Sequence, residues 1–309
     1  MILNENFKGG LLIASGMLIL AITDNYVRFI SEDIGLWQFH LIRSLIAVPA
    51  MILFASLRSY DFWPKNLKLV ALRTAILVLA MFIYFGSLAF FPISQVAAGL
   101  FTSPIFVIIF SVLFLGESLY FSRIVAVFLG TVGISIVLGI NVLDLSFLSI
   151  IPVASGAFYA LASLALRRWC YNETPTSIML IFFLGMGIFA AKMTFLIEIN
   201  QFFGIFMISE TFLTFPLKIP SEETFYIVIG HAAGSILGGI LITAGYQKGE
   251  TSFVSVFEYS FLLFATLWAY MFFSEFISST VLFGMILIVL SGFLISLSEK
   301  KNNFSQFET

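Results

Sequence analysis

A single carboxylate within an otherwise apolar stretch is the first residue of this sequence that could do chemistry. Glu258 lies in the apolar run 252–273, about 9 Å from the start of that run if the run is helical. Tyr246 and Gln247 end the preceding apolar run, and Tyr259 follows Glu258 directly. This group predicts either ligands for a polar molecule or a carboxylate that exchanges protons. The alternative is a structural hydrogen-bond partner for a neighbouring helix.

Arg43 and His40 form a second candidate group. Arg43 lies about 9 Å inside the apolar run 36–57, and His40 precedes it by three residues, so both share one helix face. A guanidinium there could hold a carboxylate or a phosphate through two parallel hydrogen bonds. The alternative is a buried ion pair with a carboxylate such as Asp24.

Charged and polar residues also gather near the end of the run 10–30. Asp24 and Arg28 are four residues apart, a spacing that favours an ion pair within one helix. Asn25 lies beside Asp24 and adds an amide to the group. We therefore expect a satisfied pair at a helix end, with ligand binding as the alternative role.

Lys192 lies in the run 176–197 and is long enough to extend its ammonium to a membrane interface, which is the position we expect for it. Arg28 and Arg43 fall at a similar depth. If all three side chains faced one cavity, they would form a positive vestibule that attracts anionic groups. This vestibule is a hypothesis that the sequence leaves open.

His231 and Ser235 are one helical turn apart in the run 224–246. A serine next to a histidine is a possible nucleophile with its base. The sequence around Ser235 contains no Gly-x-Ser-x-Gly motif, and no third group of a catalytic triad is evident. An intramembrane hydrolase is therefore the weaker interpretation, and His231 stays a candidate for substrate binding.

The composition indicates the environment in which these groups work. Of the 309 residues, 60% are apolar and 10% are charged, and the mean hydropathy is +1.07. Soluble domains have about 45–50% apolar and about 25% charged residues, so most of this surface must face lipid. An ionisable side chain in hydrocarbon costs about 2.5–3.5 kcal/mol, so each of the groups above needs an explanation.

The chain length suits ten transmembrane helices, because each span with its connection takes roughly 25–30 residues. The hydropathy and the turn residues predict spans at 10–30, 36–57, 69–89, 94–115, 121–141, 147–167, 176–197, 224–246, 252–273 and 280–298. The segment 198–223 is interrupted by Glu210, Pro216, Lys218 and Pro220. We expect it to be a loop with a short interfacial helix rather than an eleventh span.

Basic residues predict the orientation of these spans. With the amino terminus in the cytoplasm, nearly all loop lysines and arginines face that side, as the positive-inside rule requires. These residues are Lys8, Arg58, Lys65, Lys68, Arg73, Arg123, Arg167, Arg168, Lys248, Lys300 and Lys301. Lys218 is the exception, with Arg28 at an outer helix end. Both termini are therefore expected in the cytoplasm.

The two halves of the chain repeat short motifs. Ala14-Ser15-Gly16 recurs as Ala154-Ser155-Gly156, and Gly116-Glu117 resembles Ser274-Glu275. Five spans per half is an odd number, so the second half must be inverted relative to the first, as in many alternating-access carriers. We expect a first repeat at 1–141, a second at 147–298 and a cytoplasmic tail at 299–309.

Two features of the repeats have structural interpretations. Glu117 and Glu275 each end a span, and we expect them to act as turn and capping residues. Ridges of small residues on a helix let a neighbouring helix approach closely. The simpler interpretation of these ridges is static packing, and the functional one is a surface along which the two moving halves slide. The ridges are Gly230, Gly234, Gly238 and Gly239 in span eight, Gly130 and Gly133 in span five, and Gly284 and Gly292 in span ten.

The five-plus-five pattern, the Gly-Glu and Ser-Glu endings and the stretch Phe257-Glu258-Tyr259 resemble the EamA type of the drug/metabolite transporter superfamily. This resemblance implies an inner-membrane carrier with a cavity lined by spans one to four and six to nine. Such carriers take up S-adenosylmethionine or riboflavin, or export amino acids. Span four carries Pro104 where span nine carries Leu262, a departure from strict repetition.

The sequence thus predicts an all-α membrane protein that carries a small polar metabolite by alternating access. Nothing suggests a bound cofactor, because no Walker-type loop is present, and the lone Cys170 with two histidines cannot build most metal sites. A net charge of −2 gives no reason to expect nucleic acid. A membrane-embedded enzyme and a channel are the rival classes, and a homodimer in the bilayer stays open.

Overall fold

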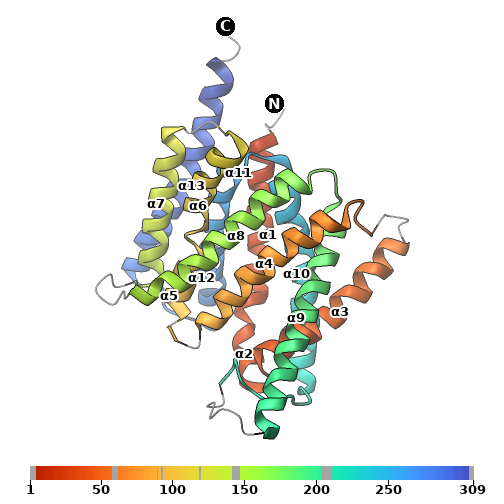
Figure 1. The fold of residues 1–309 in the computed structure, drawn as a ribbon. Helices are drawn as coiled ribbons and strands as arrows, with labels where there is room; N and C mark the ends of the chain where they lie inside the picture. The colour runs from red at the N-terminus through yellow and green to blue at the C-terminus, as the bar shows by residue number, and fades with distance from the viewer. Residues whose placement is uncertain are drawn as a thin grey trace.

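A computed structural model describes residues 5–57, 62–88, 90–91, 93–117, 120–140, 147–203 and 211–305. Within these ranges the chain forms helices and turns without a strand. Figure 1 shows a helical bundle in which the first helix begins and the last helix ends at the same end of the bundle. An even number of spans produces this arrangement, as the sequence predicts. Residues 58–61, including Arg58, and Pro92 lie outside the described ranges.

The first half contains α1 (Glu5–Asn25), α2 (Val27–Asp33), α3 (Leu36–Leu57), α4 (Leu67–Ser87), α5 (Ile93–Leu100), α6 (Ser103–Phe110), the π-helix η1 (Ser111–Leu115) and α7 (Phe121–Val137). The second half contains the 3₁₀ turn η3 (Phe147–Ser149), α8 (Ile150–Trp169), α9 (Pro175–Phe203), α10 (Glu222–Lys248), α11 (Thr251–Val254), the 3₁₀ segment η4 (Ser255–Tyr259), α12 (Ser260–Phe273) and α13 (Ser279–Ser305).

The prediction of an all-α membrane protein is confirmed. Nine helical segments of the described chain are long and apolar enough to cross a bilayer, and the shorter α7 lies at the predicted fifth span. The outer surface of the bundle is apolar, as contact with lipid requires. Large side chains that are more than half exposed include Leu45, Leu53, Phe128, Phe195 and Phe283.

Three of the predicted spans are interrupted. Span one breaks at Tyr26, between α1 and α2. Span four breaks at Phe101 and Thr102, where the Thr102 hydroxyl donates to the Gly99 carbonyl and Pro104 stands in the first turn of α6. Span nine is divided into α11, η4 and α12. Such breaks leave backbone N–H and C=O groups without helical hydrogen-bond partners inside a membrane. They are tolerated where the segment is packed against protein.

The segment after the predicted span seven is helical in its first described part and a loop in its second. Helix α9 continues to Phe203, and residues 211–221 follow without a helix. This loop is attached to the first half, because the Leu36 amide donates to the Phe212 carbonyl over 2.7 Å and Lys218 pairs with Asp33 at 2.7 Å. The expected short interfacial helix was placed within 198–223, of which residues 204–210 lie outside the described ranges.

Helices from the two halves pack against each other through small residues. α1 lies against α10, where a Cβ on Gly16 would come within 2.7 Å of the Gly238 carbonyl oxygen. α7 lies against α13 in the same way, through Gly133 and Gly284. Two glycines of the expected ridges, Gly230 and Gly292, have no such neighbour within 4 Å.

The remaining contacts follow a regular scheme. α1 also contacts α12, while α8 contacts α4, α5 and α6, and α3 lies against α9. Span one thus contacts spans eight and nine, and span six contacts spans three and four. Figure 1 shows α1 and α8 running in opposite directions between the two ends of the bundle.

Candidate functional site

The Glu258 carboxylate lies buried among hydroxyl groups from three other helical segments. Glu258 is 3% exposed in η4, and its Oε1 accepts a hydrogen bond from the Tyr159 hydroxyl of α8 over 2.8 Å. Its Oε2 lies 3.5 Å from the Ser103 hydroxyl at the start of α6. Tyr246 of α10 is 1% exposed and interacts electrostatically with both Glu258 and Tyr159. We call Glu258, Tyr159, Tyr246, Ser103 and Arg73 the carboxylate cluster.

Arg73 brings a positive charge to this cluster. The sequence places it among the cytoplasmic anchors, but the structure buries it in the second turn of α4 with 6% exposure. Its Nε lies 3.4 Å from the Ala162 carbonyl, and its guanidinium interacts electrostatically with Tyr159, Tyr246 and Cys170. The prediction of a surface anchor is therefore wrong, because α4 turns this side chain towards α8 and not towards solvent.

Two residues that the sequence analysis grouped with Glu258, Gln247 and Tyr259, have other contacts in the structure. The Gln247 amide donates to the carbonyls of Cys170 and Glu173, each over 2.8 Å, and so ties α10 to the connection between α8 and α9. The Tyr259 hydroxyl lies 3.0 Å from Thr131 on α7, and its ring packs on Gly130. Both side chains are occupied by packing within the protein.

A second polar group lies farther along α10. His231 Nε2 is 3.1 Å from Asp24 Oδ1 of α1, and His231 Nδ1 is 3.0 Å from the Ser235 hydroxyl. His231 is 4% exposed, whereas the Asp24 side chain is 43% exposed. Fifteen residues separate His231 from Tyr246, so the two groups are roughly 22 Å apart along the helix. They belong to different depths of the bundle.

Arg43 and His40 border this second group from α3. The Arg43 guanidinium lies over the rings of Phe39 and Phe183, at 5.5 Å and 5.6 Å from their centroids, and interacts electrostatically with Asp24. His40 is 3% exposed, lies between aromatic rings, and neither of its ring nitrogens has a hydrogen-bond partner. Arg43 is thus near enough to interact with Asp24, but the buried ion pair that the sequence offered as an alternative does not form.

The predicted pair between Asp24 and Arg28 does not form. Arg28 instead contacts Glu275 at 2.6 Å and lies 4.2 Å from the centroid of the Phe273 ring. The break at Tyr26 ends the regular helix between the two residues, so the four-residue spacing no longer places them on one face. Asn25 donates to the carbonyls of Ala21 and Ala265 and joins α1 to α12.

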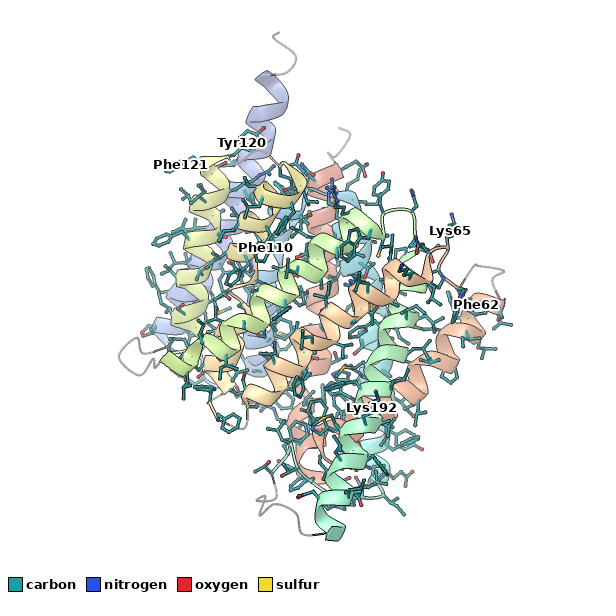
Figure 2. The ribbon with its side chains drawn as sticks, viewed as in Figure 1. Phe62, Lys65, Phe110, Tyr120, Phe121 and Lys192 are labelled. Atoms are coloured by element: carbon teal, nitrogen blue, oxygen red, sulfur yellow. The ribbon has the colours of Figure 1, made fainter. Side chains whose placement is uncertain are left out.

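Lys192 lies on α9 with an exposed side chain, as Figure 2 shows in the lower part of the bundle. Arg28 is 40% exposed and engaged with Glu275, while Arg43 is buried among aromatic rings. These different surroundings give no support to a single positive vestibule formed by the three cations. An exposed lysine fits the interfacial position that the sequence predicts.

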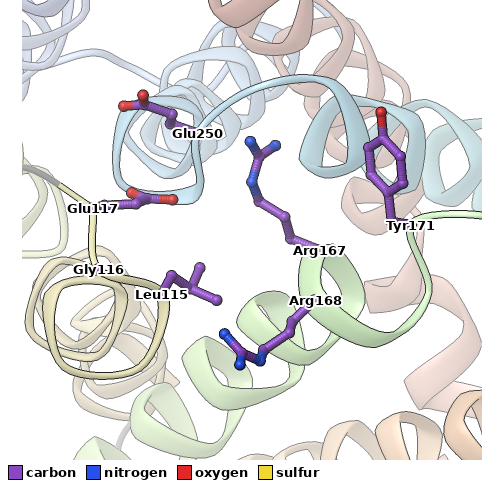
Figure 3. Close-up of a pocket in the computed structure, with 7 residues that line it drawn as sticks. All are labelled: Leu115, Gly116, Glu117, Arg167, Arg168, Tyr171 and Glu250. Carbon is purple, nitrogen blue, oxygen red and sulfur yellow. The ribbon is translucent and has the colours of Figure 1, made fainter.

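A pocket of about 490 Å³ lies at the end of the bundle that holds the termini. Figure 3 shows Arg167 extending towards the segment that carries Glu250, whereas Arg168 points towards Leu115 and donates to the Phe114 carbonyl over 3.0 Å. Glu117 accepts hydrogen bonds from the amides of Thr251 and Ser252 over 3.0 Å and 3.2 Å. It therefore caps α11 in the opposite half rather than the helix that follows it.

Arg123 reinforces this connection. It is 2% exposed at the start of α7, donates to the Ser252 hydroxyl over 2.6 Å and pairs with Glu250. Its Nη1 also lies 3.9 Å from Glu117. We call Glu117, Arg123, Glu250, Thr251 and Ser252 the end clamp, because it holds the two halves together at this end.

Sequence reasoning missed Tyr159, Ser103 and the burial of Arg73. Tyr159 follows the repeated Ala154-Ser155-Gly156 motif within an apolar span, and this position was the available signal. Arg73 gave no such signal, because a basic residue near a span end is usually an anchor. Asp24 was recognised as a candidate, but its contact with His231 was not, so the third group beside His231 and Ser235 was missed.

Comparisons with known proteins agree with this architecture. Residues 7–139 match the EamA-like transporter family. A pseudopaline exporter, CntI, of Pseudomonas aeruginosa is 24% identical over 304 residues, covering 97% of this chain and 100% of that protein. A riboflavin transporter of Vibrio cholerae is 25% identical over 308 residues, covering 96% and 95%. An S-adenosylmethionine uptake transporter of Rickettsia bellii is 22% identical over 230 residues, covering 74% and 72%.

A solved crystal structure of a protein superposes with a TM-score of 0.77 at 16% identity, covering 95% of this chain and 98% of that chain. This likeness shows the fold. The helical membrane architecture and the transporter relatives define the class as a secondary transporter of a small metabolite. The match over residues 7–139 and the relatives named as transporters support membership of the drug/metabolite transporter superfamily.

Proposed function

We propose that this chain carries a small polar metabolite across the cytoplasmic membrane by alternating access, with both termini in the cytoplasm. The basic residues support this orientation, because Lys8, Arg167, Arg168 and Lys248 lie at the end of the bundle where α1 begins and α13 ends (Figure 1). That end is then cytoplasmic, and α2 with the loop after α9 faces outward.

The observation that carries the proposal is the burial of Glu258 inside a membrane-spanning bundle. A carboxylate there is expensive and persists where it serves a pathway or a ligand. Glu258 is held by hydroxyl groups that can rotate, from Tyr159 and Ser103. A substrate can replace these hydroxyl groups without breaking an ion pair. The carboxylate cluster is therefore the proposed binding site.

We also propose an internal two-fold relation between residues 1–141 and 147–298, an arrangement that suits alternating access. Gly116 and Ser274, at matching ends of spans four and nine, both adopt left-handed backbone conformations with φ of 68° and 54°. The following glutamates both contact the other half of the chain, since Glu275 pairs with Arg28 and Glu117 accepts hydrogen bonds from the Thr251 and Ser252 amides. In a carrier with inverted halves, equivalent contacts at the two ends close and open in turn.

The end clamp suggests which state this structure represents. Glu117 caps α11 and joins the halves at the proposed cytoplasmic end. At the other end Glu275 contacts Arg28, and both side chains are exposed, by 51% and 40%. The cytoplasmic end is therefore the closed one in our proposal. Release to the cytoplasm then requires the clamp to separate.

Flux in proteoliposomes tests the proposal. Purified protein is reconstituted, and uptake of riboflavin, S-adenosylmethionine and amino acids is measured as a function of concentration. Saturable uptake that is accelerated by unlabelled substrate on the opposite side supports a carrier. Flux that rises without saturation indicates a channel and contradicts the proposal. Glu258→Gln should lose transport, while the exposed Glu223→Gln serves as the matched control.

One observation favours the alternative of a membrane-embedded enzyme. Asp24, His231 and Ser235 are linked by hydrogen bonds in the order of a catalytic triad. Their geometry favours positioning of His231 instead. Ser235 and His231 lie one turn apart on α10, where the backbone amides are engaged in the helix and cannot form an oxyanion hole. Ser235→Ala should therefore leave transport intact, and hydrolysis of ester substrates that disappears in this variant would support the enzyme.

A further inference from the structure

The carboxylate cluster contains one positive and one negative side chain, and neither has a charged partner. Arg73 Nη1 is buried without any hydrogen-bond partner, and no carboxylate of the described chain lies within 4.0 Å of this guanidinium. Glu258 contacts only hydroxyl groups, with no cation of the described chain at that distance. Removing both charges from water without pairing them is strongly unfavourable.

The two charges are separated by tyrosine. Tyr159 donates to Glu258 and interacts electrostatically with Arg73, while Tyr246 interacts with the same two residues. The Tyr246 hydroxyl is itself buried, and its polar neighbours include the Glu258 carboxylate and the Ser163 hydroxyl. Arg73 and Glu258, each without a charged partner in the described part of the chain, therefore border the same two tyrosine hydroxyls.

We propose that the carboxylate cluster binds a zwitterion, with the substrate ammonium at Glu258 and the substrate carboxylate at Arg73. This inference rests on the carrier function proposed above and specifies its substrate class. A neutral metabolite would leave both buried charges uncompensated, and a simple anion would compensate only Arg73. A molecule that carries an amine and a carboxylate satisfies both, and the Tyr246 hydroxyl can bind either group.

The second polar group of the bundle is less suited to this task. Asp24 is already bonded to His231, and its side chain is 43% exposed. Arg43 lies against the rings of Phe39 and Phe183, which partly compensate its charge. These residues therefore do not offer a matched pair of unpartnered opposite charges.

Ligand analogues that lack one charge provide the test. Thermal unfolding of the purified full chain is first measured with the standard L-amino acids, because a bound ligand raises the unfolding temperature. For the amino acid with the largest shift, the same measurement is made with its amide and with the deaminated acid. We expect each analogue to bind roughly tenfold to hundredfold more weakly, since each lacks one charge-assisted contact.

Variants assign each charge to its residue. The Arg73→Gln variant should bind the amino acid and its amide with similar affinity. The Glu258→Gln variant should bind the amino acid and its deaminated analogue with similar affinity. Arg73→Lys and Glu258→Asp keep the charges and should retain the preference in part, which separates recognition from a folding defect. The exposed Lys68→Gln on α4 and Glu223→Gln on α10 should behave as the wild type.

The outcomes separate this inference from the carrier function. Equal binding of the amino acid, its amide and its deaminated analogue by the wild type would overturn the zwitterion site. Saturable transport of riboflavin alone would also overturn it, while leaving the carrier intact. If no probe shows saturable flux in proteoliposomes, the carrier function itself fails and the zwitterion site fails with it.

Discussion

The end clamp makes a quantitative prediction at Glu117. This carboxylate is 9% exposed and accepts hydrogen bonds from the amides of Thr251 and Ser252 and from the Ser252 hydroxyl. Hydrogen bonds to a charged group contribute about 1.5–3 kcal/mol each, and loss of a helix cap costs about 1–2 kcal/mol. These contributions overlap, so Glu117→Ala should lower the free energy of opening at α11 by about 2–3 kcal/mol.

Hydrogen exchange of the peptide that contains Thr251 and Ser252 measures this loss. A decrease of about 2–3 kcal/mol corresponds to roughly 30- to 150-fold faster exchange of these amides. Glu117→Gln keeps an acceptor oxygen but not the charge, so its exchange should increase only about fivefold, equivalent to about 1 kcal/mol.

Glu275→Ala is the matched control, because Glu275 occupies the corresponding position at the other end and contacts Arg28 instead of a helix start. In the Glu275→Ala variant, the amides of Thr251 and Ser252 should exchange at the same rate as in the wild type. If Glu117→Ala exchanges within about threefold of the wild type, the capping energy derived from the charged hydrogen bonds is wrong. Equal acceleration by Glu275→Ala would show a general loosening rather than a local clamp.

Three further predictions concern packing and exposure. Burial raises the pKa of the Cys170 thiol to about 11, so at neutral pH the thiol stays protonated in the folded chain. Maleimide should therefore label the folded protein slowly at pH 7, faster as the pH rises towards 11, and rapidly after unfolding. Fast labelling of the folded protein at pH 7 would contradict the burial of Cys170. Gly16→Ala should destabilise the contact between α1 and α10 by about 1–3 kcal/mol, because its Cβ meets a backbone oxygen, whereas Gly230→Ala should leave the unfolding temperature unchanged. The exposed pair of Arg28 and Glu275 should contribute less than about 1 kcal/mol in a double-mutant cycle, and a coupling of several kcal/mol would refute its classification as a surface pair.

The bundle was largely predictable because membrane spans are specified by local composition. Each of the ten predicted spans corresponds to observed helical segments, and the loop before α10 is described without a helix in residues 211–221. What hydropathy cannot show is a break inside a span. The turns at Tyr26 and Thr102 lie in apolar sequence, and they form because tertiary packing compensates the freed backbone groups.

The candidate site was predictable in its residue types but not in its partners. Glu258 and Tyr246 were recognised because a carboxylate and tyrosines in hydrocarbon need explanation. The direction of a side chain depends on the rotation of its helix, and so Arg73 was assigned to the surface. Arg28 was paired with the wrong carboxylate for a related reason, since the break at Tyr26 changes the relative direction of the two residues.

The division into two repeats stays a prediction that the contacts support. Span one contacts spans eight and nine, and span six contacts spans three and four, as a two-fold relation requires. The family match covers only residues 7–139, so it does not test the second repeat directly. The matching left-handed residues Gly116 and Ser274 are the most specific sign of this relation.

Alternating access to the carboxylate cluster can be measured with a single engineered thiol. Ser103→Cys in a Cys170→Ser background places the thiol beside Glu258, and a membrane-impermeant maleimide is applied to inside-out and right-side-out vesicles. Our account predicts labelling from each side in turn, with the bound substrate slowing both reactions. Labelling that occurs from one side only, under all substrate conditions, would contradict a carrier whose two halves expose one site to both faces of the membrane.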